Sequence, residues 1–306
     1  MTVLQFPDGY LRRPLTPEDA QAVTDLVAST ELDVDGEVEI DLTDVQGDWE
    51  RPSFDLATMA IGVEHDGTLV AFEEQFRGRA EVEVHPGHRG RGLGTALAHW
   101  TAGAARREGK TLVGQTVSDA HTSARALFRA LGYEHGWTSW VLRIELDGLD
   151  GAPTLPGGYV LREWRPGQDD RALFDVVDTA FEEWSDREGH AFEDWAASML
   201  RHPAVAPSTT PVVQHEGQIV GAAIGMDYGP EMKEGWVQQL AVARQHRGLG
   251  IGRALLHESF RRFRNRGKAQ AGLSTDSRTG ALRLYEHVGM KVDRSYTHWT
   301  MQLGDA

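Results

Sequence analysis

The chain carries one glycine-rich string twice, and this duplication restricts its possible folds more than any other feature. The two copies are Arg89-Gly90-Arg91-Gly92-Leu93-Gly94 and Arg247-Gly248-Leu249-Gly250-Ile251-Gly252. Shorter segments repeat as well: Gly9-Tyr10 resembles Gly158-Tyr159, and residues 63–67 resemble residues 213–217. A repeat spacing of about 150 residues is far too long for a solenoid and predicts a duplicated domain.

The spacing between these landmarks differs in the two halves. Residues 63–67 and 213–217 lie 150 positions apart, whereas the glycine strings lie 158 positions apart, so the second half has about eight additional residues before its string. The segment 147–158 is dense in glycine and proline, which is typical of a linker. A chain of 306 residues suits two domains. We predict a first domain over 1–147, a linker over 148–158 and a second domain over 159–306.

Both halves show the same predicted order of elements. A strand (10–13 and 159–163) leads into a helix, and a variable segment follows. A hairpin comes next, with turns at Asp66-Gly67 and Glu216-Gly217; Asp-Gly is a strong hairpin signal. The glycine string then joins a strand to a long amphipathic helix, and another strand, a short helix and a final strand complete the half. This mixture of strands and helices predicts an α/β or α+β domain.

The glycine strings have a chemical meaning as well as a structural one. Glycine lets the backbone adopt positive φ values and lets a ligand approach without a Cβ in the way. A glycine loop that opens a helix directs several free N–H groups at one point, which predicts a phosphate or pyrophosphate site. The alternative is a tight turn between strand and helix with no ligand. The strings match neither the dinucleotide fingerprint nor a P-loop.

The composition excludes several classes of function. Without cysteine the chain has no disulfide, thiolate metal ligand or cysteine nucleophile, which fits a cytoplasmic location. A net charge of −15 disfavours nonspecific nucleic-acid binding. The 13 histidines show no metal-binding spacing, so we expect no metal. We also expect neither a signal peptide nor a membrane segment, because no apolar run approaches about 18 residues.

The residues around the second glycine string make its interpretation more specific. Leu240-Ala241-Val242 precedes the string, and Ala281, Leu284-Tyr285-Glu286 and Gly289-Met290 follow it after one strand. This constellation resembles the pyrophosphate loop and the C-terminal signature of the GNAT superfamily of acetyl-coenzyme A-dependent N-acetyltransferases. The resemblance spans both halves, so the chain is similar to tandem GNAT proteins. Its layout and length resemble those of tandem members in which the C-terminal domain is the active one.

The resemblance implies two GNAT-like domains, each with a mixed, twisted sheet that is flanked by helices and splays open beside the strand before the glycine string. Acetyl-coenzyme A, as co-substrate, would lie in the splay. The implied contacts in the second half are Leu240, Ala241, Val242, Arg247, Gly248, Leu249, Gly250, Ile251, Gly252, Arg253 and Arg278. Those in the first half are Val84, Arg89, Gly90, Arg91, Gly92, Leu93, Gly94 and Thr95.

The resemblance also implies that the two halves are chemically unequal. In the family a tyrosine near the cofactor sulfur commonly acts as general acid, and Tyr285 holds that position, whereas the first half has Phe128. A phenol can donate a proton and a phenyl ring cannot, so we expect catalysis in the second half. The alternative for Tyr285 is a packing residue. The family often has asparagine where this chain has Arg278 and His121, and Arg278 could meet a coenzyme A phosphate instead.

Transfer to an amine also requires a group that takes a proton from the amine. Glu234 is the first candidate for this base because it lies nearest the entry to the strand before the second string. Glu231 and Asp276 are further candidates, and each of the three is alternatively a solvated loop charge. We expect segment 181–195 to recognise the amine through its aromatic and acidic side chains. The alternative for that segment is an amphipathic helix with a solvated acidic face.

These expectations together predict an N-acetyltransferase that moves an acetyl group from acetyl-coenzyme A to a primary amine of a small molecule. Transfer would be direct, within a ternary complex, because the chain has no cysteine and shows no activated serine. The alternatives are a protein N-acetyltransferase, an enzyme for longer acyl chains, and a non-catalytic acyl-coenzyme A sensor or scaffold. A monomer and a homodimer are equally compatible with the sequence.

Overall fold

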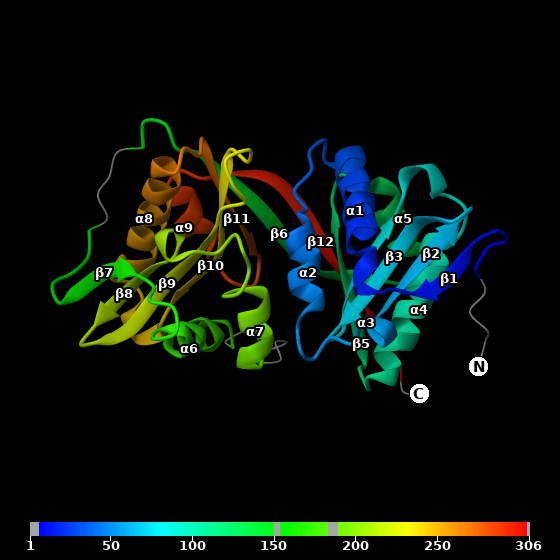
Figure 1. The fold of residues 1–306 in the computed structure, drawn as a ribbon, viewed down its shortest axis with the longest axis horizontal. Helices are drawn as coiled ribbons and strands as arrows, with labels where there is room; N and C mark the ends of the chain where they lie inside the picture. Colours follow the sequence, from blue (N-terminus) through cyan, green and yellow to red (C-terminus); the bar gives the residue numbers. More distant parts are fainter. Residues whose placement is uncertain (1–5, 150–153, 183–188, 305–306) are drawn as a thin grey trace. The chain divides into compact units, whose positions relative to one another are not determined.

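A computed structural model describes residues 6–149, 154–182 and 189–304 of the chain (Figure 1). The strands of the first half are β1 (Leu11–Pro14), β2 (Ala60–His65), β3 (Thr68–Phe76), β4 (Arg79–Val84), β5 (Leu112–Ser118) and β6 (Glu134–Glu145). Its helices are α1 (Ala20–Val34), α2 (Leu42–Trp49), α3 (Leu56–Met59), α4 (Leu93–Arg107) and α5 (Thr122–Ala130), with the 3-10 turns η1 (Pro17–Asp19) and η2 (Pro86–His88).

The second half repeats this order of elements. Its strands are β7 (Tyr159–Glu163), β8 (Pro211–His215), β9 (Gln218–Met226), β10 (Glu234–Val242), β11 (Gln270–Asp276) and β12 (Lys291–Gln302). Its helices are α6 (Asp170–Phe181), α7 (Phe192–Ser198), α8 (Ile251–Asn265) and α9 (Leu282–His287), with the 3-10 turns η3 (Pro207–Thr209) and η4 (Arg244–His246).

The chain forms two compact units, and each unit takes its last strand from the other half of the sequence. The first unit comprises the described residues up to Thr138 together with those from Ser295 onward, and the second comprises those between. In the first unit the strand order is β1-β2-β3-β4-β5-β12, and in the second it is β6-β11-β10-β9-β8-β7. Thus β12 pairs antiparallel with β5, and β6 pairs antiparallel with β11.

These units differ from the contiguous domains 1–147 and 159–306 predicted above. The physical reason is the pairing of the two final strands, which carries residues from Ser139 onward into the second unit and those from Ser295 onward into the first. Each sheet is mixed, because β4–β5 and β10–β11 are parallel while the other pairs are antiparallel. The predicted fold class is confirmed. Residues 150–153 of the predicted linker lie outside the described part of the chain.

Both predicted hairpins are present. Asp66 and Gly67 have positive φ values, as do Glu216 and Gly217, and these two-residue turns join β2 to β3 and β8 to β9. Two left-handed residues in succession match the right-handed twist of the strands that they connect.

The eight additional residues of the second half lie between its middle strands. In the first unit the two-residue turn 77–78 joins β3 to β4, whereas residues 227–233 join β9 to β10. The strand β10 is also three residues longer than β4. The second unit therefore has a longer strand leading to its glycine string and a larger loop at the far end of that strand.

Helices cover both faces of each sheet. In the first unit α1 and α2 pack on one face around Phe72, and α4 and α5 pack on the other. In the second unit α6 and α7 pack around Ile224, and α8 and α9 pack on the opposite face around Leu273. The apolar stripes predicted for the two long helices are buried: Leu93, Leu97 and Trp100 on α4, and Leu255, Leu256, Phe260 and Phe263 on α8.

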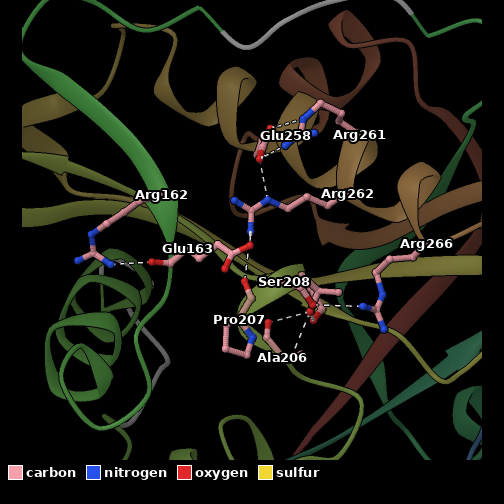
Figure 2. A network of polar contacts seen from close by, with 11 residues as sticks. Arg162, Glu163, Ala206, Pro207, Ser208, Glu258, Arg261, Arg262 and Arg266 are labelled. Carbon is pink, nitrogen blue, oxygen red and sulfur yellow. Dashed lines mark hydrogen bonds and ion pairs between the residues drawn. The ribbon is translucent and has the colours of Figure 1, made fainter.

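A polar network holds α8 within the second unit (Figure 2). The Arg262 Nε atom donates to Glu258 Oε1 at 2.7 Å, and its Nη1 atom donates to the carbonyl oxygen of Pro207 at 3.2 Å. Arg261 Nη2 also donates to Glu258 Oε1, at 2.7 Å. Burial alone would raise the pKa of the Glu258 carboxyl group, but hydrogen bonds from the two arginines outweigh burial and hold that pKa below its usual value.

Candidate active site

Each glycine string forms a turn that opens a long helix, and we call residues 89–94 and 247–252 the first and second cradle. Gly90 and Gly92 have φ values of 73° and 89°, and Gly248 and Gly250 have values of 76° and 81°. Residues with a Cβ rarely adopt such values. The helices α4 and α8 begin directly after the second of these glycines. Each cradle therefore presents N–H groups at a helix N-terminus, the geometry that favours an anion.

The arginine at the start of each cradle points back to the preceding strand. Arg247 Nε donates to the carbonyl oxygen of Val242 at 2.9 Å, and Arg89 Nε donates to that of Val84 at 3.1 Å. Arg89 also pairs with Asp33 of α1 at 2.5 Å. In both units the guanidinium group therefore closes the turn between strand and cradle.

The strand before each cradle separates from its parallel neighbour. The β10–β11 ladder runs from Glu234↔Gln270 to Val237↔Leu273, after which β10 continues to Val242 paired with β9 alone. The β4–β5 ladder consists of two residue pairs, Arg79↔Gly114 and Ala80↔Gln115. A strand that loses one neighbour exposes a row of N–H and C=O groups to an extended ligand. This opening leads directly to the cradle in each unit.

The second unit has a β-bulge in this region. The β9–β10 register shifts between Val237 and Gln239, so Gln238 is an extra residue, whereas the β3–β4 register is continuous from Phe76↔Arg79 to Ala71↔Val84. A bulge bends the strand and re-aims the groups beyond it. It lies where β10 leaves β11, and thus it distinguishes the opening of the second unit from that of the first.

The last glycine of each cradle lies against the short helix that follows. A Cβ at Gly94 would stand 2.8 Å from Leu127 Cδ2 of α5, and a Cβ at Gly252 would stand 3.4 Å from Leu284 Cδ2 of α9. Glycine is therefore required for this close approach in the first unit, whereas in the second unit a Cβ would be near ordinary van der Waals distance. In the second unit the neighbouring Tyr285 packs in one cluster with residues of α8.

Tyr285 and Phe128 occupy corresponding places in the two units. Tyr285 lies on α9 with 7% of its surface exposed, and Phe128 lies on α5 with 4% exposed. Tyr285 packs in the cluster formed by α8, α9 and their sheet, and Phe128 stacks on Trp299 of β12. Burial raises the pKa of the Tyr285 hydroxyl group to about 12, so the phenol keeps its proton at neutral pH.

The three carboxylates considered as bases have unequal positions. Glu234 begins β10, eight residues before Val242 and thus roughly 26 Å along the strand at about 3.3 Å per residue. Its Oε1 atom accepts a hydrogen bond from Arg143 Nε at 2.9 Å. Asp276 ends β11 and binds Arg278 Nη2 at 2.7 Å, and Glu231 is exposed in the β9–β10 loop. The structure thus places neither Glu234 nor Glu231 beside the cradle.

The segment predicted to recognise the amine forms the end of α6 and the helix α7. Trp195 Nε1 donates to Gln239 Oε1 of β10 at 3.0 Å, which attaches α7 to the strand beside the opening. Phe192 and Trp195 pack against Phe174 of α6. His190 Nδ1 lies 3.7 Å from Asp178 Oδ1. Residues 183–188 of this segment lie outside the described part of the chain.

Sequence reasoning missed a group of carboxylates in the first unit. Glu74 of β3 pairs with Glu81 of β4, and Glu83 lies two residues further on, on the same face. Glu81 is the most exposed of the three side chains. Burial raises the pKa of Glu74 and that of Glu83 to about 7. Alternating glutamates in a strand beside a cradle are the signal that could have revealed them.

The second unit has uncharged residues at the same three positions. In the two strand pairings, Ile224 and Gln239 take the places of Glu74 and Glu81, and Ala241 takes the place of Glu83. The strand that enters the second cradle is therefore free of the acidic side chains that line the first.

Comparison with known proteins assigns the class that this architecture indicates. Residues 26–133 and 170–290 match the model of the acetyltransferase (GNAT) family. The chain belongs to this family as a tandem GNAT protein, and it is an acyltransferase. No helix in the described part of the chain is long and apolar enough to span a membrane.

Individual relatives cover most of the chain. A mycothiol acetyltransferase from Thermobispora bispora is 31% identical over 228 residues, which are 73% of this chain and 74% of the relative. One from Actinosynnema mirum is 28% identical over 298 residues, 92% and 96% of the two chains. The crystal structure of a GCN5-related N-acetyltransferase from Sphaerobacter thermophilus matches with a TM-score of 0.78 and 31% identity, over 99% of this chain and 98% of that one.

Proposed function

We propose that this protein transfers an acetyl group from acetyl-coenzyme A to a primary amine of a small molecule, and that the second unit performs the transfer. One arrangement carries the proposal: the second unit joins an anion cradle, an open strand edge and a buried tyrosine on the adjoining helix. The relatives named mycothiol acetyltransferases support a small-molecule acceptor.

We assign the parts of acetyl-coenzyme A to the second unit in order, starting with the pyrophosphate at the cradle. The N–H groups of residues 247–252 suit a pyrophosphate, and Arg253 is exposed in the first turn of α8, where it can meet a phosphate. Leu240, Ala241 and Val242 lie on the edge of β10 that β11 has left, where backbone groups suit an extended amide-bearing chain. Asp276 holds Arg278 at the end of β11, and we assign to Arg278 a contact with a second phosphate group.

Transfer forms a C–N bond and breaks the C–S bond of the thioester. We assign to Tyr285 the donation of its phenolic proton to the departing sulfur, and the proton released by the amine restores the phenol through solvent. Glu234 is a poor base because it already pairs with Arg143 at the far end of β10. We therefore assign to Glu234 a structural role, and no single side chain to the base.

The first unit suits binding better than transfer. Phe128 has no proton to give to a departing thiolate. Its cradle has the same glycine conformations as the second. We assign to Val84 and residues 89–95 the binding of coenzyme A without catalysis.

A screen of purified protein for thiol release from acetyl-coenzyme A tests the function. The acceptor panel comprises amino sugars, aminoglycosides, amino acids, polyamines and a peptide with a free N-terminus. We expect turnover with a small primary amine and acetylation of its nitrogen by mass spectrometry. Turnover with the peptide and with no other acceptor would show that the acceptor is a protein N-terminus and not a small molecule. Coenzyme A binding by calorimetry without turnover on any acceptor would favour the non-catalytic sensor.

A further inference from the structure

The Gly-Tyr and His-x-Gly segments that accompany the glycine strings in the sequence meet beside the second cradle. Tyr159 of β7 stacks on His215 at the end of β8, with ring centroids 4.3 Å apart and planes at 17°. The Tyr159 hydroxyl group lies 2.8 Å from Nδ1 of His246 in η4. His246 directly precedes Arg247, the first residue of the cradle. Three separated segments thus converge on the residue that leads into the cradle.

The hydrogen bonds fix the roles of the two imidazoles. His215 Nδ1 lies 3.1 Å from the carbonyl oxygen of Gly158, which accepts, so that nitrogen carries the proton. A neutral His246 whose Nδ1 accepts from the tyrosine hydroxyl group carries its proton on Nε2. Gly158 has a φ of 86°, and a Cβ there would stand 3.5 Å from His215 Cε1. The positive φ, and not a lack of space beside the histidine, is what favours glycine before the tyrosine.

The first unit repeats this arrangement with its own residues. The Tyr10 hydroxyl group lies 3.0 Å from His88 Nδ1, and the Tyr10 ring lies 4.9 Å from that of His65. His88 directly precedes Arg89. The two units thus have the same three residue types in the same places, although their β-bulge and their carboxyl groups differ. Because both units also have a cradle, we associate this cluster with the cradle.

The location of His246 explains how the cluster acts. η4 joins β10 to the cradle. The Arg247 guanidinium group binds the carbonyl oxygen of Val242, and the Tyr159 hydroxyl group binds His246 within the turn. Without the Tyr159–His246 hydrogen bond, η4 loses its side-chain hydrogen bond to β7, and the N–H groups that must point together at an anion lose part of their fixed arrangement. Preorganised donors bind more tightly because they lose less freedom on binding.

We propose that Tyr159, His215 and His246 are positioning residues that hold the second cradle in the geometry for the coenzyme A pyrophosphate. The proposal rests on the proposed function, since it assumes that acetyl-coenzyme A occupies this cradle. The cluster acts on donor binding and not on the transfer step. Its signature is therefore a change in KM for acetyl-coenzyme A at constant kcat.

Thiol-release kinetics of Tyr159→Phe, His246→Ala and His246→Asn test the proposal, with the amine that the wild type uses best. Tyr159→Phe keeps the ring stack and removes one hydrogen bond, so we expect KM for acetyl-coenzyme A to rise roughly threefold to tenfold, with kcat within twofold of wild type. His246→Ala should behave alike. His246→Asn should restore KM toward wild type, because its side-chain oxygen can accept in place of Nδ1.

Tyr133→Phe is the matched control, because it removes a buried hydroxyl group with no hydrogen-bond partner among the described residues, and it should leave KM unchanged. A KM in Tyr159→Phe and His246→Ala equal to that of wild type would overturn the proposal. So would a parallel loss of kcat and thermal stability that His246→Asn does not reverse, since that pattern reports folding alone. Absence of acetyl-coenzyme A binding by the wild type would instead overturn the proposed function, and the positioning role with it.

Discussion

Tyr285 and Phe128 differ by one oxygen atom at corresponding places of the two units. Both side chains are buried at corresponding places on short helices, so packing alone does not require a hydroxyl group there. Burying a hydroxyl group costs free energy unless it is hydrogen-bonded. The raised pKa of Tyr285, about 12, keeps its proton in place over the neutral range. Both properties are compatible with the role of general acid that we propose for Tyr285.

We expect Tyr285→Phe to lower kcat by roughly a hundredfold or more, because removal of a general acid typically lowers the rate by about 10²–10⁴. The KM for acetyl-coenzyme A and the melting temperature should change little, since phenylalanine already packs at the corresponding place of the first unit. Thiol-release kinetics and thermal unfolding measure these quantities. Turnover equal to that of wild type would remove Tyr285 from the mechanism.

Glu234 gives the opposite expectation. Glu234→Gln breaks its ion pair with Arg143, whose side chain is 15% exposed, and should lower the melting temperature by roughly 2–4 °C. The kcat should stay within about threefold of wild type, because the carboxylate lies at the far end of β10. Glu231→Gln, at an exposed loop position, is the control. A large loss of kcat, with the loss of one ionisation from the pH–rate profile, would restore Glu234 as the base.

The backbone of the second cradle was predictable from sequence, because its glycines and the helix after them follow a known pattern. Glycines with positive φ, and a helix that starts after them, follow from local rules. The ion pair of Glu234 was not predictable, since Arg143 lies 91 positions away on a strand that the sequence assigned to the other domain. Glu234 lies at the start of β10, and the cradle follows the other end of this nine-residue strand. Nearness to the start of the strand therefore did not indicate nearness to the cradle.

At the scale of elements, the β3–β4 hairpin makes the first unit sensitive to pH. Glu74 and Glu83 have pKa values of about 7 when folded, above the ordinary value of 4.5, because burial disfavours their charged forms. Their contribution to stability is complete below about pH 4.5 and is lost as the pH rises through 7. We expect the melting temperature of the protein to fall between pH 5 and pH 8.

The double variant Glu74→Gln/Glu83→Gln removes both titrations, and its melting temperature should vary less over this range. Glu50→Gln/Glu134→Gln, at two exposed positions, is the matched control and should keep the wild-type pH dependence. Calorimetric scans at several pH values measure both. A double variant that follows the wild-type curve would show that the pKa values of these two carboxyl groups are not raised by folding.

The elements themselves were largely predictable, and their irregularities were not. Hairpin turns such as 66–67 and strands beside glycine strings follow from local patterns. The bulge at Gln238 depends on the register of β10 against β9. The sequence of one strand does not determine its register with a neighbour, so the bulge could not be predicted. The carboxyl groups of β4 were missed although alternating glutamates are unusual in a buried sheet.

At the scale of the whole molecule, the division of the chain has a direct test. Residues 1–147 contain β1 to β6 but lack β12, and residues 159–306 lack β6. We expect neither fragment alone to unfold cooperatively as a monomer, because each lacks the strand that completes its sheet. A chain that joins residues 6–138 to 295–304 through a flexible linker should form the first unit. Circular dichroism melts and sedimentation measure the outcomes, and a stable monomeric 1–147 fragment would contradict the expectation.

The sequence predicted two units and not their boundaries, for a physical reason. Ser139-Trp140-Val141-Leu142 in β6 resembles His298-Trp299-Thr300-Met301 in β12. Because the two strands have similar patterns, the sequence alone does not indicate which of them pairs with β5 and which with β11.

The exchange of final strands also determines when the first unit can complete its sheet during synthesis of the chain. Leu112 of β5 pairs with Gln302 of β12, 190 positions later in the sequence, so the ribosome must synthesise β12 before the first unit can close its sheet. Until then β5 lacks its partner on that side, and an unpaired strand edge is prone to aggregate.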